Sequence, residues 1–358
     1  MKLGFFTMPM HPIGKDWQIS LREDREAFIL ADQLGFVEGY VGEHATDPEE
    51  NITSSAMFLA TLVDATKQMK LGTGTINMPN HHPATTASHI AMLDHLLGGR
   101  FILGISPGAL PSDAEVFGNF DLPRPALFLE AINHLLALWT TAPPYNLKGE
   151  HWNISTARTY IPETSMGTVP QPLQRPHPPI VVTAVAPFSQ GITEAAARGW
   201  DPISANFLLP QWVKTHWGKY VEGCARANRP ADPANWRVAK TVCVARDDAT
   251  AAAYATSPNG PYYYYYRSLF NKLKRRGALG VFKSDPKMPD DSVTLEQVIQ
   301  QLVIHGSPSK VADQIHAFKE QIGEFGTMLY AGVDWTDREL ARNSMILMAE
   351  KVLPLVNA

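Results

Sequence analysis

The chain has 358 residues, of which 45% are hydrophobic and 18% charged, and its formal net charge is −4. This balance excludes a disordered or collagen-like chain, and it gives no strong attraction to nucleic acid or to an anionic membrane. Cys224 and Cys243 are the only cysteines, so neither a CxxC metal site nor a disulfide framework is expected. The opening apolar run is too short for a signal peptide, and no window approaches the roughly 18 apolar residues of a membrane span. We therefore expect a soluble, cytoplasmic protein.

Short apolar runs alternate with amphipathic segments through the first half of the chain. The apolar runs predict strands at 3–8, 39–41, 71–78 and 101–105. The segments between them predict helices at 21–34, 54–65, 83–97 and 125–139. Strands that are apolar throughout and separated by helices indicate βα units, with a parallel sheet buried on both faces.

The second half repeats this rhythm less regularly. It predicts strands at 179–185, 201–205, 236–245 and 325–331, and helices at 189–198, 211–227 and 337–355. About eight βα units in a chain of this length predict an α/β protein, a single (β/α)8 TIM-barrel domain over residues 1–358. A doubly wound sheet is the alternative. It would normally show a dinucleotide fingerprint, and the glycine pattern that begins at Gly72 ends on Asn77 instead.

Two insertions interrupt the rhythm. Residues 143–179 are rich in proline and contain a predicted hairpin at 145–155. Residues 257–291 contain five consecutive tyrosines, 262–266, and the basic run KLKRR. Insertions of this length in a barrel usually lie on its loops, so we expect the second one to be a lid or an oligomer contact.

Two motifs suggest chemistry that their context does not support. GISPG at 104–108 matches the nucleophile elbow of serine hydrolases, but Pro107 has no N–H to donate in an oxyanion hole, so the match is accidental. Several histidines lie between His11 and His95, but none has HxH or HExxH spacing. No metal site is therefore expected.

Other residues stand where barrel enzymes build their sites. His44 follows the second predicted strand and Ser106 follows the fourth, both at the carboxyl-terminal face. A histidine there can move a proton near neutral pH, or it can have a purely structural role. Ser189, Gln190 and Gly191 begin a helix directly after a strand. Free N–H groups at this point suit a phosphate, although an ordinary helix cap is the simpler interpretation.

Seven motifs follow one another along nearly the whole chain. They are MKLGFF at the start, GEH at 42–44, LGTGTINMPNHHP at 71–83, LDHLLGGRFILGISPGALPSD at 93–113, YNLKGEHW at 145–152, HGSPSKVADQI at 305–315 and FGTMLYAGVDW at 325–335. In this order they resemble the bacterial-luciferase-like flavin-dependent monooxygenases. GISPGALPSD and GTMLYAGVDW most resemble the limonene 1,2-monooxygenase type within that family.

The resemblance implies a TIM barrel that binds reduced FMN, supplied by a separate NAD(P)H:flavin reductase. The reduced flavin would react with O2 to form a C4a-(hydro)peroxide, which oxygenates a small apolar molecule such as a terpene. Such barrels are commonly dimers or tetramers. The substrate and the outcome, whether epoxidation, hydroxylation or Baeyer–Villiger oxidation, do not follow from the motifs.

The resemblance also implies roles for particular residues. His44 is the catalytic histidine, Gly74 and Thr75 flank a non-proline cis peptide under the flavin ring, and Asn77 faces the isoalloxazine edge. Ser106 lies near the reactive flavin carbon. The phosphate-binding turn comprises Ser189, Gln190 and Gly191.

The chain departs from the family pattern at two positions. Pro107 replaces the arginine that holds the phosphate in luciferase, which leaves Arg158 and Arg175 as candidate cations, and Ala45 replaces a second histidine. Two alternatives to oxygenation remain open. One is hydride transfer with the deazaflavin F420, and the other is a flavin-binding protein without catalysis.

Overall fold

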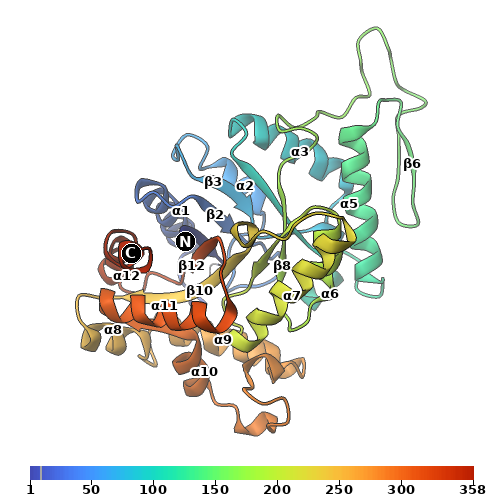
Figure 1. The fold of residues 1–358 in the computed structure, drawn as a ribbon. Coiled ribbons are helices and arrows are strands. Elements are labelled where there is room, and N and C mark those ends of the chain that lie inside the picture. Colours follow the sequence, from blue (N-terminus) through green and yellow to red (C-terminus); the bar gives the residue numbers. More distant parts are fainter. Residues whose placement is uncertain (9) are drawn as a thin grey trace.

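The computed structural model describes residues 1–8 and 10–358. Eight parallel strands close into a barrel in the order β12–β1–β2–β3–β5–β8–β9–β10, and β10 pairs again with β12 (Figure 1). Their bounds are β1 Lys2–Thr7, β2 Glu38–Val41, β3 Lys70–Thr73, β5 Phe101–Ser106, β8 Ile180–Ala184, β9 Asp201–Ser204, β10 Arg237–Val244 and β12 Thr327–Ala331. The predicted (β/α)8 barrel is confirmed.

Helices surround the barrel on its outer side (Figure 1). They are α1 Trp17–Gln33, α2 Ser55–Ala60, α3 Pro83–Leu96, α4 Pro111–Val116, α5 Arg124–Thr140, α6 Gln190–Ala197, α7 Pro210–Arg226, α8 Asp248–Ala255, α9 Pro261–Arg275, α10 Leu295–Leu302, α11 Pro308–Ile322, α12 Arg338–Leu347 and α13 Leu353–Val356. None of the helices in the described part of the chain is long and apolar enough to cross a membrane.

The period-two alternation of the strands divides the core into two layers. A small cluster fills the barrel interior: Phe6, Tyr40, Ile102, Val181, Ile203, Ala239 and Leu329. The outward-facing strand residues pack in a much larger cluster under the helices. This interior packing closes the barrel below the carboxyl-terminal ends of the strands, where a site can form.

Several predicted elements differ from the structure. The strand predicted at 71–78 divides into β3 and the short β4, Ile76–Asn77, and the Gly74–Thr75 peptide between them is cis. The helix predicted at 54–65 ends with α2 at Ala60. The helix predicted at 337–355 is interrupted by a π-helical turn, Met348–Val352. Strand β11, Val303–Gly306, and helix α11 were not predicted.

The two insertions lie on different sides of the molecule (Figure 1). The predicted hairpin is present as β6, Asn146–Lys148, paired antiparallel with β7, Asn153–Ser155. Glu130 of α5 holds it by accepting hydrogen bonds from the backbone N–H groups of residues 150, 151 and 152. The other insertion forms α9 and the turns that follow it, so the tyrosine run is helical.

Candidate active site

A cleft of about 310 Å³ opens at the carboxyl-terminal ends of the strands. Seven of the eight predicted site residues line it, namely His44, Gly74, Thr75, Asn77, Ser106, Ser189 and Gly191. Gln190, which is exposed at the start of α6, does not line it. These residues come from segments up to 147 positions apart (44 to 191), and parallel strand ends bring them to one face of the barrel.

One wall of the cleft is a row of hydrogen-bonded polar groups. The non-proline cis peptide expected between Gly74 and Thr75 is present. The Thr75 hydroxyl donates to Ser106 Oγ over 2.7 Å, and Ser106 Oγ donates to Asn77 Oδ1 over 3.0 Å. The backbone N–H of Gly108 also donates to Ser106 Oγ, over 3.1 Å. Because each polar atom has a fixed partner, the row is rigid in orientation.

A buried carboxylate that also lines the cleft supports this row. Glu43 accepts hydrogen bonds from the Asn77 backbone N–H over 3.1 Å, from the Ser55 hydroxyl over 2.7 Å and from His81 Nε2 over 2.8 Å. Burial raises the pKa of Glu43, but the contacts with His81 and Ser55 outweigh it and the net pKa is lowered. Glu43 therefore stays ionised and holds Asn77 in place, a role that its position after β2 did not reveal.

The predicted catalytic histidine is oriented by an aspartate of α4. His44 Nδ1 lies 2.8 Å from Asp113 Oδ2, and Asp113 also accepts from the backbone N–H of Ala45 and from both the N–H and the hydroxyl of Thr46. Burial raises the pKa of Asp113, but these hydrogen bonds lower it on balance. An ionised carboxylate can only accept, so His44 donates from Nδ1 and Nε2 is left to exchange a proton.

The charges around His44 favour its protonated form. Nε2 lies 3.6 Å from Glu50 Oε2. Burial lowers the pKa of His44, but the charge of Glu50, the bond to Asp113 and the charge of Asp47 together raise it above its ordinary value. Lys272 of α9 in turn contacts Glu50 Oε1 at 3.2 Å. The 257–291 insertion thus contacts the loop after His44 through Lys272, although none of its residues lines the cleft.

The turn between β8 and α6 forms another wall. Ser189 is the N-cap of α6, but its hydroxyl makes no capping bond to that helix. The first N–H groups of a helix have no partner within it, and the helix dipole favours an anion there. Ser189 and Gly191 both line the cleft, so this helix end faces it.

No lysine or arginine is among the cleft-lining residues that the structure describes. Arg158 and Arg175 are exposed on the 143–179 insertion. Arg124 of α5 lies directly behind the loop after β5. Its Nε donates to the Pro107 carbonyl over 2.9 Å, and its Nη2 would lie only 2.5 Å from a Cβ at Gly108.

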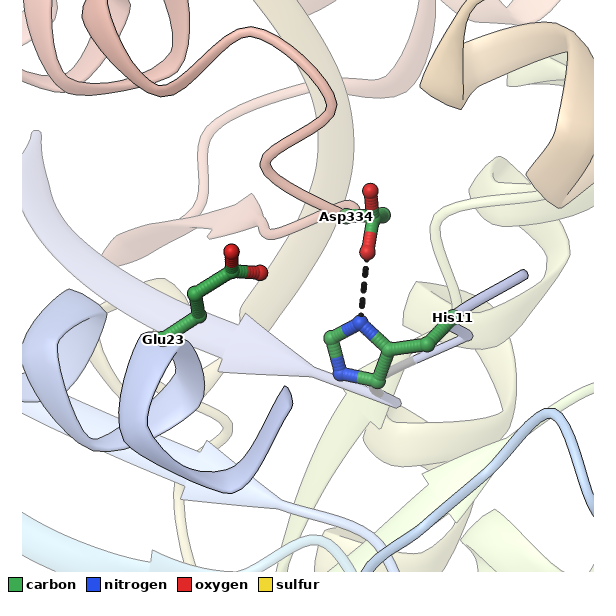
Figure 2. A group of neighbouring side chains, drawn as sticks. All are labelled: His11, Glu23 and Asp334. Atoms are coloured by element: carbon green, nitrogen blue, oxygen red, sulfur yellow. Dashed lines mark hydrogen bonds and ion pairs between the residues drawn. The ribbon is translucent and has the colours of Figure 1, made fainter. Parts of the chain in front are cut away.

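A second polar cluster lies beside the barrel, outside the cleft. His11, Glu23 of α1 and Asp334 approach closely enough to share a metal ion, and Figure 2 shows the His11 ring directed at Asp334. His11 uses both ring nitrogens, with Nδ1 2.7 Å from Asp334 and Nε2 3.0 Å from Asp24. The Lys15 ammonium bonds to both Glu23 and Asp334. Because a side-chain cation already neutralises these carboxylates, the cluster ties the chain after β1 to the loop after β12.

Residues 1–324 match the luciferase-like monooxygenase family, so the chain belongs to that family. The 4-hydroxyprotoasukamycin monooxygenase of Streptomyces nodosus subsp. asukaensis is 31% identical, over 100% of this chain and 92% of that protein. Limonene 1,2-monooxygenase of Rhodococcus erythropolis is 28% identical, over 99% of this chain and 86% of that protein.

The fold is similar to that of the oxygenating constituent of 3,6-diketocamphane monooxygenase from Pseudomonas putida, a type II Baeyer–Villiger monooxygenase solved in complex with FMN. The TM-score is 0.89 at 25% identity, over 99% of this chain and 98% of that one. The family expected from the motifs and the class of enzyme, a monooxygenase, are therefore confirmed.

Proposed function

We propose that the chain is the oxygenase component of a two-component system. It takes reduced FMN from a separate NAD(P)H:flavin reductase, uses O2 as co-substrate and oxygenates a small, largely apolar molecule. The observation that carries this proposal is one cleft, lined by seven of the eight residues that the motifs and the family resemblance assign to the site.

The size and lining of the cleft suit a small-molecule ligand. Its volume of about 310 Å³ falls within the roughly 300–1,000 Å³ of typical ligand pockets. Much of the remaining lining is apolar, with Phe6, Met8, Val185, Ile203 and Phe207. An apolar wall favours a hydrocarbon-like substrate and keeps water from the reacting atoms.

The hydrogen-bonding groups that line the cleft suit FMN in particular. The hydroxyl of Ser189 and the N–H groups at the start of α6 would hold the phosphate, and Thr75, Asn77 and Ser106 would bond the polar edge of the flavin ring. Reduced FMN, when bound, would supply the activation of O2. His44 would hold or release a proton at Nε2, because Asp113 fixes Nδ1.

The function is tested by mixing the anaerobic protein and FMNH2 with oxygenated buffer while near-ultraviolet absorbance is followed. We expect a transient absorbance that outlives the oxidation of free FMNH2 by at least about tenfold, because a water-excluding site protects the oxygenated cofactor. The control is the same mixture without protein. Oxidation at the rate of free FMNH2, with no transient, would contradict the proposal and direct the next binding experiment to reduced F420.

Arg124 supplies the positive charge that Pro107 cannot. Its guanidinium donates hydrogen bonds to the neutral oxygens of Pro107, Asn119 and Asn80, and the charge of Asp113 also acts on it. A cation whose hydrogen bonds all go to neutral oxygens, and which holds the cleft-lining Pro107, favours an anionic ligand nearby. We infer that it neutralises the FMN phosphate.

The Arg124→Gln variant is therefore expected to weaken FMN binding by about 10- to 100-fold, the value of one charge-assisted hydrogen bond. Riboflavin, which lacks the phosphate, should bind as it does to the parent chain. Titration of both flavins, followed by fluorescence, measures this. Arg158→Gln is the matched control, because Arg158 is exposed on the hairpin insertion. Equal losses for FMN and riboflavin would contradict this role.

A further inference from the structure

Two adjacent residues of α7 hold the turn that precedes α6. The Phe188 backbone N–H donates to Thr215 Oγ1 over 2.9 Å, and His216 Nε2 lies 2.9 Å from the Ala186 carbonyl oxygen. One turn earlier on the same helix, the Trp212 ring packs edge-on against Phe188, with ring centroids 6.5 Å apart. The turn is thus attached to α7 at both of its ends.

The conformation of the turn needs such attachment. Phe188 has φ +54°, in the left-handed region. A residue with a Cβ is disfavoured there by roughly 1–2 kcal/mol relative to its ordinary conformations. Its side chain is largely exposed, so burial of the ring contributes little to holding it. The hydrogen bond to Thr215 therefore fixes the direction in which the chain enters α6.

The protonation of His216 follows from its neighbours. Trp236 Nε1, which can only donate, lies 2.9 Å from Ser204 Oγ, and that hydroxyl lies 2.8 Å from His216 Nδ1. Ser204 accepts from Trp236 and donates to Nδ1, so the ring proton lies on Nε2 and is donated to Ala186. Burial lowers the pKa of His216 to about 4, which keeps the ring neutral.

A continuous chain of donors thus runs from the barrel wall to the turn. Trp236 begins the approach to β10, Ser204 ends β9, and His216 lies on α7. All three are fully buried, with an exposure of 0%. Rigid groups of the barrel therefore locate the carbonyl of Ala186, itself a cleft-lining residue, three positions before Ser189.

We propose that Thr215 and His216 are positioning residues for the phosphate end of the flavin, holding the 186–189 turn so that Ser189 and the first N–H groups of α6 face the cleft. This inference rests on the proposed function and deepens it. Neither residue lines the cleft. They act through the turn and do not contact the ligand.

The test compares the dissociation constants of oxidised FMN and riboflavin for the full chain and for Thr215→Val. We expect the variant to bind FMN about tenfold more weakly, because the phosphate loses charge-assisted hydrogen bonds when the turn relaxes. Riboflavin should be unaffected. Thr215→Ser keeps the accepting oxygen and should restore FMN binding. Tyr220→Phe is the matched control, since it removes a hydroxyl from the same helix that bonds to Asp201, away from the turn.

His216→Asn provides a second variant, with the same expected loss of FMN over riboflavin. An equal loss of affinity for both flavins, or unchanged FMN affinity in Thr215→Val, would overturn the inference and leave the proposed function standing. A parent chain that binds FMN no more tightly than riboflavin, or that binds neither at millimolar concentration, would instead overturn the proposed function. The two failures are thus distinguishable.

Discussion

Gly104→Ala is expected to destabilise the fold by about 3 kcal/mol or more, at the upper end of what overpacking costs. A Cβ on Gly104 would lie 1.8 Å from the carbonyl oxygen of Thr73 and 3.3 Å from Val181 Cγ2. The first contact is with backbone, so no side-chain rotation relieves it. Strands β3 and β5 would have to separate, which also breaks the two hydrogen bonds between the Thr73 hydroxyl and Gly104.

Urea unfolding followed by circular dichroism measures this change. Gly218→Ala is the control, because Gly218 lies within α7 and a Cβ there meets nothing within 4 Å. That substitution should stabilise the protein by about 0.5–1 kcal/mol, the helix-propensity difference between the two residues. If Gly104→Ala unfolded at the same urea concentration as the parent chain, the close approach of β3 and β5 would be wrong.

The barrel could be predicted because its strands obey a local rule. Strands buried on both faces are apolar throughout, and this pattern is visible in runs such as residues 101–105 without knowledge of their neighbours. The same reasoning did not predict that the tyrosine run, 262–266, is helical. Tyr262, Tyr265 and Tyr266 are buried at helical spacing on α9, while Tyr263 and Tyr264 are partly exposed. Five identical residues carry no periodicity, so only packing selects the helix.

The candidate site divides in a similar way. His44, Ser106 and Ser189 could be predicted because each stands at the end of a strand or the start of a helix, where a barrel places its chemistry. Asp113, Arg124 and His216 could not. Each acts on a residue at least 16 positions away, His44, Gly108 and Ala186 respectively, and that pairing is decided by the tertiary fold. Asp113 lies within a predicted motif, but nothing local shows that it faces His44.

The buried cluster around His11 is expected to make the protein less stable as the pH rises above neutrality. Burial lowers the pKa of His11, but its bonds to Asp24 and Asp334 outweigh burial and raise the pKa to about 9. The unfolded chain has the ordinary value of 6.5. The folded state therefore binds the proton more tightly, so this stabilisation is complete below pH 6.5 and is lost progressively as the pH rises to 9.

The loss amounts to about 3 kcal/mol, since each unit of pKa difference is worth about 1.4 kcal/mol. Lys15 and Glu23 complete the charged surroundings of the ring. His44 and His81 also have raised pKa values and add to the loss of stability at alkaline pH, so the parent chain alone does not isolate the contribution of His11.

The difference in unfolding free energy between the parent chain and His11→Gln isolates that contribution. Urea unfolding from pH 6 to pH 9.5 should show this gap narrowing by about 3 kcal/mol. The control is His89→Gln, at an exposed position of α3, and its difference in unfolding free energy from the parent chain should stay constant across the same range. A constant gap between the parent and His11→Gln would show that His11 is neutral in the folded state, with both aspartates held by other cations.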